Sequence, residues 1–221
     1  METEVHMKEF LKNFPWKRLV WAIWLPVYIA TYLLLEHIFS GNDSVKWITD
    51  TVIDAWIPFY EGFIIAYLSW FLYIVGTGFY LLLSNEPAFK RYMVFLAVTF
   101  FSCALFWVIV PNGQGLRPEV YPRDNLCTDL VKWIHSIDTP TNVFPSEHII
   151  GTCGALIGLW DAGLLKKQPE RFLFILWGIL IAASTVCLKQ HAFIDILGGV
   201  GLSAVAGFFV YKRRIFPGKV A

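Results

Sequence analysis

The sequence predicts an all-α, polytopic membrane protein with six transmembrane helices, and three observations support this prediction. Of the 221 residues, 57% are hydrophobic and 16% are charged, and the mean hydropathy is +0.56; a soluble domain of this size carries more charge. The chain contains several apolar runs near the length of about 20 residues that a membrane-spanning helix needs. Its basic residues are also divided unequally between the two sets of loops, as in membrane proteins.

The apolar runs place the six helices along the chain. The predicted spans are Leu19–Phe39, Ile57–Leu83, Tyr92–Val110, His148–Leu165, Phe172–Leu188 and Ala192–Tyr211. Residues 1–18 are too polar for a cleaved signal peptide and are expected to form an interfacial helix. Residues 45–56 are too polar to span and are expected to lie along the surface. Because there is no internal repeat or linker, residues 1–221 are expected to form one integral domain.

The distribution of Lys and Arg predicts the orientation of these helices. Six spans place 13 basic residues on the side of the two termini and five on the opposite side. Basic residues favour the cytoplasmic side, so both termini are expected in the cytoplasm. The long loop of residues 111–147 and the turn between the fifth and sixth spans are then expected to face outward together. The net charge of +1 gives no reason to expect a nucleic-acid partner.

Three outward-facing pieces carry polar groups that need a partner or a function. In the piece that ends the fifth span and starts the sixth, His191 and Asp195 are four residues apart and share one face of a helix. The carboxylate can accept the Nδ1 proton and leave the other ring nitrogen as a nucleophile. The alternative is a histidine at a helix start that bonds an aspartate for structural reasons only.

A second piece, Phe144–His148, predicts the start of a helix. Pro145 suits the first turn, and Ser146 offers a hydroxyl for capping. The free N–H groups and the dipole of such a helix make its N-terminus an anion site. His148 lies in that turn, where it can protonate a leaving oxygen. The alternative is a well-capped helix without a ligand.

The third piece, residues 114–118, contains Arg117. Its guanidinium can bind two phosphate oxygens at once, and the alternative is a solvated loop charge paired with Glu119 or Asp124. Two histidines, an aspartate, an arginine, a lysine and a helix N-terminus are thus expected on one membrane face. That combination favours phosphoryl transfer, in which charge stabilisation dominates and a histidine can carry the phosphoryl group.

The three pieces resemble the signature motifs of the type-2 phosphatidic acid phosphatase superfamily, in the same order. Those motifs are Lys-x6-Arg-Pro, Pro-Ser-Gly-His and Ser-Arg-x5-His-x3-Asp. Here they correspond to Arg117-Pro118, to Pro-Ser-Glu-His148 and to Ser184 followed by His191-x3-Asp195. The resemblance covers about residues 110–199, and the six-span layout extends it along the chain. It implies a lipid phosphate phosphatase that needs no metal or other cofactor.

The resemblance also implies a role for each matching residue. His191 is the nucleophile that attacks phosphorus, and Asp195 orients and charges its imidazole. His148 protonates the leaving group and later activates water. Arg117 and Ser146 bind phosphate oxygens.

The chain departs from the motifs at several positions. Val110 stands where the family has lysine, and Gln114 lies closer to the motif arginine and offers a hydrogen bond without a charge. Thr185 stands where the last motif has arginine. Lys189 follows one helical turn later, and we expect its ammonium to replace the missing guanidinium. The alternative is a lysine that extends to the interface or to lipid headgroups.

Two acids are candidates for the substrate entrance. Glu61 lies at the outer start of the second span, where a solvated helix-start acid is the alternative. Glu147 replaces the glycine of the middle motif and places an extra carboxyl beside the site. In the outer loop, residues 126–137 have apolar side chains at helical spacing. They predict a surface helix that dips into the headgroups and serves as a lid.

We therefore expect an integral membrane enzyme with its active site on the extracytoplasmic side, and the outward site favours a bacterial plasma membrane. Its substrate is expected to be a lipid phosphomonoester or diphosphate of the phosphatidate, phosphatidylglycerol phosphate or undecaprenyl diphosphate type, and its other partners are the surrounding membrane lipids. A lipid phosphotransferase is an alternative, because the Ser-Thr-x-x-x-Lys-Gln-His form also resembles inositol phosphorylceramide synthase-like proteins. A haem or quinone protein is another, although the two span-end histidines share one side and form no opposed axial pair. A catalytically degenerate binding protein is the third, because two cationic motif positions are lost.

Overall fold

The computed structural model describes residues 11–40 and 45–212. Their elements, in chain order, are η1 (Trp16–Ala22), α2 (Trp24–Phe39), β1 (Trp47–Ile48), η3 (Glu61–Phe63), α3 (Ile64–Ser84), α4 (Glu86–Ile109), β2 (Asn112–Gly113), α5 (Leu126–Ile137), α6 (Glu147–Asp161), α7 (Gln168–Cys187), α8 (Phe193–Gly207) and the π-helical turn η4 (Phe208–Lys212). The predicted all-α, polytopic class is confirmed. The first ten residues of the predicted interfacial helix at 1–18 lie outside the described residues.

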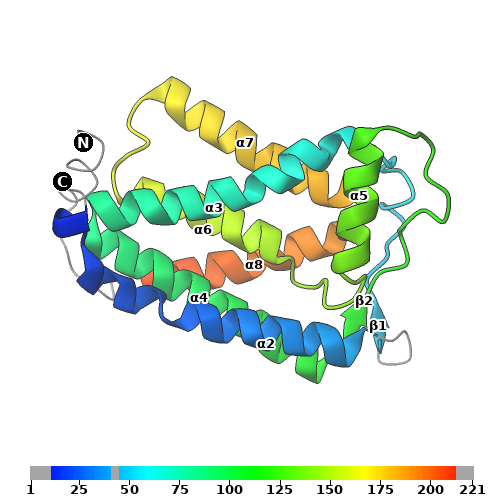
Figure 1. Cartoon of the computed structure of the whole chain (residues 1–221), viewed down its shortest axis with the longest axis horizontal. Helices are drawn as coiled ribbons and strands as arrows, with labels where there is room; N and C mark the ends of the chain where they lie inside the picture. The colour runs from blue at the N-terminus through cyan, green and yellow to red at the C-terminus, as the bar shows by residue number, and fades with distance from the viewer. Residues whose placement is uncertain (1–10, 41–44, 213–221) are drawn as a thin grey trace.

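Among the described residues, helices α2, α3, α4, α6, α7 and α8 run lengthwise, and α5 lies across one end of them (Figure 1). Within the described residues, five helical segments are long and apolar enough to cross a membrane: Trp16–Phe39, Glu61–Ser84, Glu86–Ile109, Gln168–Cys187 and Phe193–Lys212. The sixth lengthwise helix is α6. With 15 residues, it measures about 22 Å, and it packs against α3, α4, α7 and α8.

Several predicted span boundaries differ from the structure for local reasons. The second span was expected from Ile57, but its helix begins at Glu61, because the residues around Pro58 are not helical. The third begins earlier than expected, at Glu86, where the side chain of Asn85 caps the helix by accepting from the backbone N–H of Ala88. The fourth ends at Asp161, well before the expected end, because the chain turns sharply through a left-handed backbone at residue 163.

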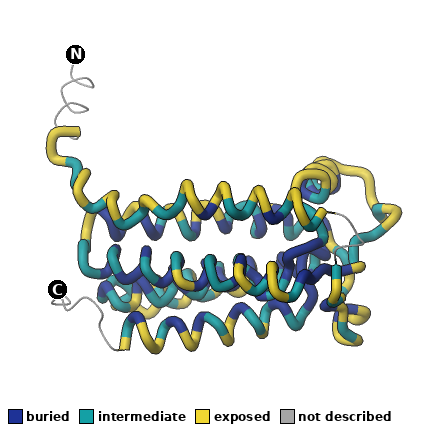
Figure 2. Tube along the Cα trace, turned by 90° about the horizontal axis from the view of Figure 1, so that it is seen from below, coloured by how far each residue is buried: buried dark blue, intermediate teal, exposed yellow. Residues whose placement is uncertain are grey.

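The interior of the bundle is apolar and rich in aromatic side chains, among them Trp70, Tyr92, Phe95 and Trp107. Buried positions face the centre and exposed positions face outward (Figure 2). Many of the exposed side chains are large and hydrophobic. Such a surface suits contact with lipid rather than water.

The end of the bundle near α5 is built from segments far apart in the sequence (Figure 1). Strand β1 pairs in parallel with β2, with Trp47 opposite Asn112. The amphipathic helix expected at residues 126–137 is confirmed as α5, whose Val131 and Ile134 pack against Tyr67 of α3 and against Leu188. The starts of η1, α4 and α7 and the end of η4 lie at the opposite end.

The stretch of residues 45–56 was expected to lie along the surface, and part of it does, because the side chains of Val52 and Trp56 are exposed. Asp54, by contrast, is buried, and its carboxylate accepts a hydrogen bond of 2.7 Å from the backbone N–H of Phe193. The segment therefore covers the start of α8. The sequence prediction missed this contact because it joins residues 139 positions apart.

Candidate active site

The start of α8 holds His191 against Asp195. The Nδ1 atom of His191 lies 3.3 Å from Oδ2 of Asp195, and the same oxygen accepts a 2.8 Å hydrogen bond from the backbone N–H of Ala192. Asp195 is completely buried. One oxygen of its carboxylate both caps α8 and contacts the imidazole of His191. This contact favours the tautomer with its proton on Nδ1, which leaves the Nε2 lone pair for another partner.

The start of α6 brings a second histidine to that nitrogen. The Nδ1 atom of His148 lies 3.3 Å from Nε2 of His191. Two features hold the starts of α6 and α8 together. The backbone N–H of Ser146 donates to the carbonyl of Asp195 at 3.1 Å, and Gly199, which has no side chain, lets α8 come close to α6. A Cβ at residue 199 would lie 2.9 Å from the carbonyl oxygen of Ser146, closer than real Cβ atoms come.

The ring of His148 is held by two aromatic side chains of α3. The ring centroids of Tyr67 and Trp70 lie 4.6 Å and 4.5 Å from that of His148. The indole of Trp70 also donates to the carbonyl of His148 at 2.9 Å. Gly151 makes room for this indole, since a Cβ there would meet it at 2.9 Å. Both the backbone and the ring of His148 are therefore positioned by α3.

The Ser146 hydroxyl does not cap α6 as the sequence prediction expected. Ser146 occupies the N-cap position without a side-chain capping bond, and Pro145 precedes the helix instead of lying in its first turn. The hydroxyl is buried without a hydrogen-bond partner among the described residues, and so are Oδ1 of Asp195 and Nε of Arg117. Buried polar atoms are normally paired. A phosphate oxygen can accept from the Ser146 hydroxyl and from the Nε–H of Arg117, whereas Oδ1 of Asp195 is an acceptor and needs a donor.

Arg117 is fixed inside the protein, so the alternative of a solvated loop charge is wrong. Its guanidinium donates to the carbonyls of His135 and Asp138, at 2.9 Å and 2.7 Å, and to Oε1 of Gln190 at 2.6 Å. Burial lowers the pKa of Arg117, and the neighbouring Asp138 opposes this effect. An arginine nonetheless stays charged at neutral pH. The site thus contains a charged guanidinium that is held by Gln190, the residue directly before His191.

The side chains of Gln114 and Lys189 both donate hydrogen bonds to backbone carbonyls. The amide of Gln114 donates to the carbonyl of Lys189 at 2.8 Å. The Lys189 ammonium donates to the carbonyls of Asp54 and Ile57, at 2.9 Å and 2.6 Å, and burial lowers its pKa. The side chain is 8% exposed, so it does not extend to the interface. Two of its three N–H groups are occupied, and binding of phosphate by the third stays a prediction.

Lys189→Met is expected to lower turnover about tenfold to a hundredfold, the effect of losing one hydrogen bond between charged groups. Lys189 has φ = 59°, a strained backbone that methionine neither relieves nor worsens. The carbonyls of Asp54 and Ile57 lose their donor, so the rate is expressed per amount of folded protein in the membrane. Initial rates of phosphate release measure the effect. Lys46→Met, which changes an exposed lysine near β1, is the matched control. Unchanged turnover in Lys189→Met would refute a phosphate-binding role.

The two acids proposed for the substrate entrance are both engaged within the protein. Glu61 is buried, and its carboxylate accepts two hydrogen bonds of 2.6 Å from Arg123, so the alternative of a solvated acid is wrong. Glu147 accepts a hydrogen bond from the Tyr28 hydroxyl of α2. These contacts fasten the outer loop to η3 and α6 to α2. A part in substrate entrance stays a prediction for both residues.

Helix α5 is fastened to the site through His135. Burial, aided by the charge of Arg117, lowers the pKa of His135 to about 4. The neutral ring lies 3.0 Å from the carbonyl of Leu188 through Nε2 and 2.8 Å from the Tyr121 hydroxyl through Nδ1. The backbone carbonyl of His135 accepts a hydrogen bond from Arg117. The position of α5 therefore also sets the position of the guanidinium.

A family model of the PAP2 superfamily matches residues 91–216, which is more than half of the chain. The chain belongs to the PAP2 superfamily. This confirms the resemblance to type-2 phosphatidic acid phosphatases that the three motifs indicate. No curated protein and no solved structure matches the chain. The part that matches the PAP2 superfamily begins within α4 and contains all three motif pieces.

Three residues of this PAP2 site escaped the sequence prediction. Tyr67 lies on α3, before the part that matches the PAP2 superfamily, and looks like any aromatic residue of a membrane span. Asp138 follows α5 directly and accepts hydrogen bonds from Tyr32 and Gln190. Gln190 had a usable signal, because it directly precedes the proposed nucleophile between two apolar spans, where a polar side chain needs a partner.

Proposed function

We propose that the protein is a lipid phosphatase that hydrolyses a phosphomonoester or diphosphate through a phosphohistidine intermediate. This proposal rests on the two contacts of the His191 ring. Its Nδ1 atom lies 3.3 Å from the Asp195 carboxylate, and its Nε2 atom lies 3.3 Å from Nδ1 of His148. An imidazole oriented by a carboxylate on one nitrogen is a nucleophile on the other. A second imidazole beside that nitrogen is placed to move a proton during the same reaction.

The proposed reaction has two steps. The Nε2 atom of His191 forms a bond to phosphorus while the bond to the leaving oxygen breaks, and His148 gives its proton to that oxygen. Water then attacks the phosphohistidine, and His148 takes up a proton from it. Inorganic phosphate leaves, and both histidines return to their first state. Asp195 stabilises the positive charge that develops on the His191 ring in the first step.

The unpaired buried atoms support a phosphate cradle around this nitrogen. The Ser146 hydroxyl and the Nε–H of Arg117 are donors without a partner among the residues that the structure describes. The N-terminus of α6 adds backbone N–H groups and a favourable dipole. Phosphate oxygens satisfy such donors, and the negative charge that they carry is stabilised more strongly in a buried site than in water.

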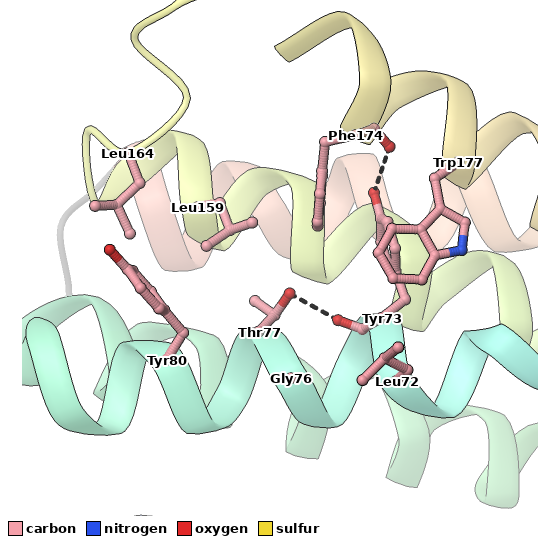
Figure 3. Close-up of a pocket in the computed structure, with 9 residues that line it drawn as sticks. All are labelled: Leu72, Tyr73, Gly76, Thr77, Tyr80, Leu159, Leu164, Phe174 and Trp177. Atoms are coloured by element: carbon pink, nitrogen blue, oxygen red, sulfur yellow. Dashed lines mark hydrogen bonds between the residues drawn. The ribbon is translucent and has the colours of Figure 1, made fainter. Parts of the chain in front are cut away.

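An apolar pocket supports the lipid part of the proposal. It measures about 470 Å³ and lies between α3, α6 and α7, with Leu72, Tyr73, Leu159 and Trp177 among its lining residues (Figure 3). Tyr73 follows Trp70, which contacts His148, by three residues, and this spacing is about 4.5 Å along a helix. We propose that the hydrocarbon chain occupies this pocket while the phosphate reaches the histidines.

The same proposal places the site on the extracytoplasmic side of a bacterial plasma membrane. The end of the bundle opposite α5 holds η1, the starts of α4 and α7 and the end of η4 (Figure 1). These segments contain Arg18, Arg91, Arg171 and Lys212. Basic residues favour the cytoplasmic side, so the histidines would face outward. A polyprenyl diphosphate or another exported lipid phosphate is then the preferred substrate.

The experiment is an assay of the purified protein in lipid nanodiscs containing EDTA, with phosphatidate, phosphatidylglycerol phosphate and undecaprenyl diphosphate as separate substrates. We expect inorganic phosphate to be released from at least one of them at a rate that EDTA does not change. Transfer of phosphate to an added labelled alcohol, in place of release, would show a phosphotransferase. Neither release nor transfer from any substrate would contradict the proposal.

A further inference from the structure

The side chain of Gln190 joins three groups of the site through one amide. Its Oε1 accepts from Nη2 of Arg117 at 2.6 Å. Its Nε2 donates to Oδ2 of Asp138 at 2.9 Å and to the Tyr67 hydroxyl at 3.2 Å. The side chain is 3% exposed, and it immediately precedes His191. Elements separated by more than 50 residues thus meet on a single neutral side chain.

Chemistry leaves only one orientation for this amide. A guanidinium has donors and no acceptor, so it must face the amide oxygen; a carboxylate has acceptors and no donor, so it must face the amide nitrogen. Gln190 therefore lies between the charges of Arg117 and Asp138 and satisfies both. Without it, the guanidinium could pair directly with the carboxylate, because Nη2 of Arg117 already donates to the carbonyl of Asp138 at 2.7 Å. Such an ion pair would compete with a phosphate for the guanidinium.

We propose that Gln190 is a positioning residue that holds the Arg117 guanidinium for the substrate phosphate and keeps it from pairing with Asp138. This inference rests on the proposed phosphatase function. Gln190 does not touch the reacting atoms; it acts through Arg117. Gln190 also donates a hydrogen bond to the hydroxyl of Tyr67, whose ring contacts the ring of His148. Gln190 is therefore linked directly to Arg117 and, through Tyr67, to the proton-transferring histidine.

Gln190→Leu tests the positioning role by removing both the oxygen and the nitrogen of the amide group. We expect the KM for the lipid phosphate and the inhibition constant of inorganic phosphate to rise about tenfold, because both report phosphate binding by the guanidinium. We expect kcat to change less, about threefold or under. Thr99→Val is the matched control: it removes a buried hydroxyl on α4 that bonds only carbonyls of its own helix.

Gln190→Glu provides a signature that lost packing cannot imitate, because the new side chain has the same shape as glutamine. Its ionised carboxylate would pair directly with Arg117 and repel Asp138, whereas its protonated form again has an acceptor for the guanidinium and a donor for the carboxylate. Burial and the Asp138 carboxylate favour the protonated form of the new carboxyl, whereas the Arg117 guanidinium favours the ionised form. The protonated fraction therefore grows as the pH falls toward the ordinary range of a carboxyl group. We therefore expect the loss of kcat/KM relative to wild type to shrink from about pH 8 to about pH 5. The new carboxyl would contact the Arg117 guanidinium, the Asp138 carboxylate and the Tyr67 hydroxyl. His191 follows it in the chain, and His135 lies on the other side of the guanidinium.

The outcomes separate the inference from the function on which it rests. If the wild type neither releases nor transfers phosphate, the proposed function fails. If the wild type is active, the positioning role is overturned by either of two results: KM and the phosphate inhibition constant stay unchanged in Gln190→Leu, or the pH profile of Gln190→Glu runs parallel to that of the wild type. Should Gln190→Leu not be recovered as a folded protein, the pH comparison with Gln190→Glu alone decides.

Discussion

His191→Ala is expected to reduce phosphate release by at least about ten-thousandfold, the scale on which removal of a covalent nucleophile acts. The variant lacks the Nε2 atom that lies 3.3 Å from Nδ1 of His148, and water held in its place is a weaker nucleophile without an oriented carboxylate partner. Initial rates with a radiolabelled lipid phosphate measure the loss. Quenching with alkaline detergent during turnover, which preserves the acid-labile bond between phosphorus and nitrogen, should trap labelled phosphohistidine in the wild type and none in the variant.

His37→Ala is the matched control for this experiment, because His37 is exposed on α2 and should keep wild-type activity. His191→Gln tests the same point with less change in packing, since it fills most of the volume of the imidazole. Size-exclusion chromatography in detergent shows whether each variant is folded. If a folded His191 variant retained about a tenth of the wild-type rate, or still became labelled, a covalent role for this histidine would be excluded.

His148→Gln is expected to slow hydrolysis of an alkyl phosphate about a hundredfold to ten-thousandfold, the usual contribution of a general acid or base. The loss should depend on the leaving group. An alkoxide needs a proton as it leaves, whereas an aryl phosphate such as p-nitrophenyl phosphate has a leaving group that departs without one. With the aryl substrate, the first step should therefore remain fast, and the second step, in which water needs a base, should limit turnover.

Two measurements check this prediction. The first compares the loss of kcat/KM for the alkyl and the aryl substrate, which we expect to differ by at least about tenfold. The second follows labelled phosphohistidine, which should accumulate in His148→Gln with the aryl substrate because it forms faster than it is hydrolysed. Equal losses for both substrates, without accumulation, would assign His148 a structural role only.

Local patterns in the sequence predicted much of the fold. Apolar runs located the six lengthwise helices of the described residues, although only five of these segments are long enough to cross a membrane. The spacing of apolar residues at 126–137 located α5 with its observed ends. These predictions succeed because helix length and amphipathicity are properties of consecutive residues. Boundaries were less accurate where proline or capping decided them, as at Glu61 and Glu86.

The candidate site was also visible in part. The spacing of His191 and Asp195 predicted their contact, but not its form: His191 precedes the N-cap residue of α8, so the two residues do not share a helix face. The motif order associated them with His148 and Arg117. The partners of those residues were not visible. The aromatic rings around His148 come from α3, and those contacts join residues about 80 positions apart.

Taken by itself, the sequence determined an all-α membrane chain and the identity of the residues with chemistry, since both depend on residue type and on spacing along one helix. Only the tertiary structure decided what those residues face: that Arg117 is held by Gln190, that the Lys189 ammonium lies on two backbone carbonyls, and that the Ser146 hydroxyl has no partner among the described residues. The physical reason is that hydrogen bonds and desolvation depend on distance in space. Segments that approach each other in the folded bundle leave no periodic signal in the chain.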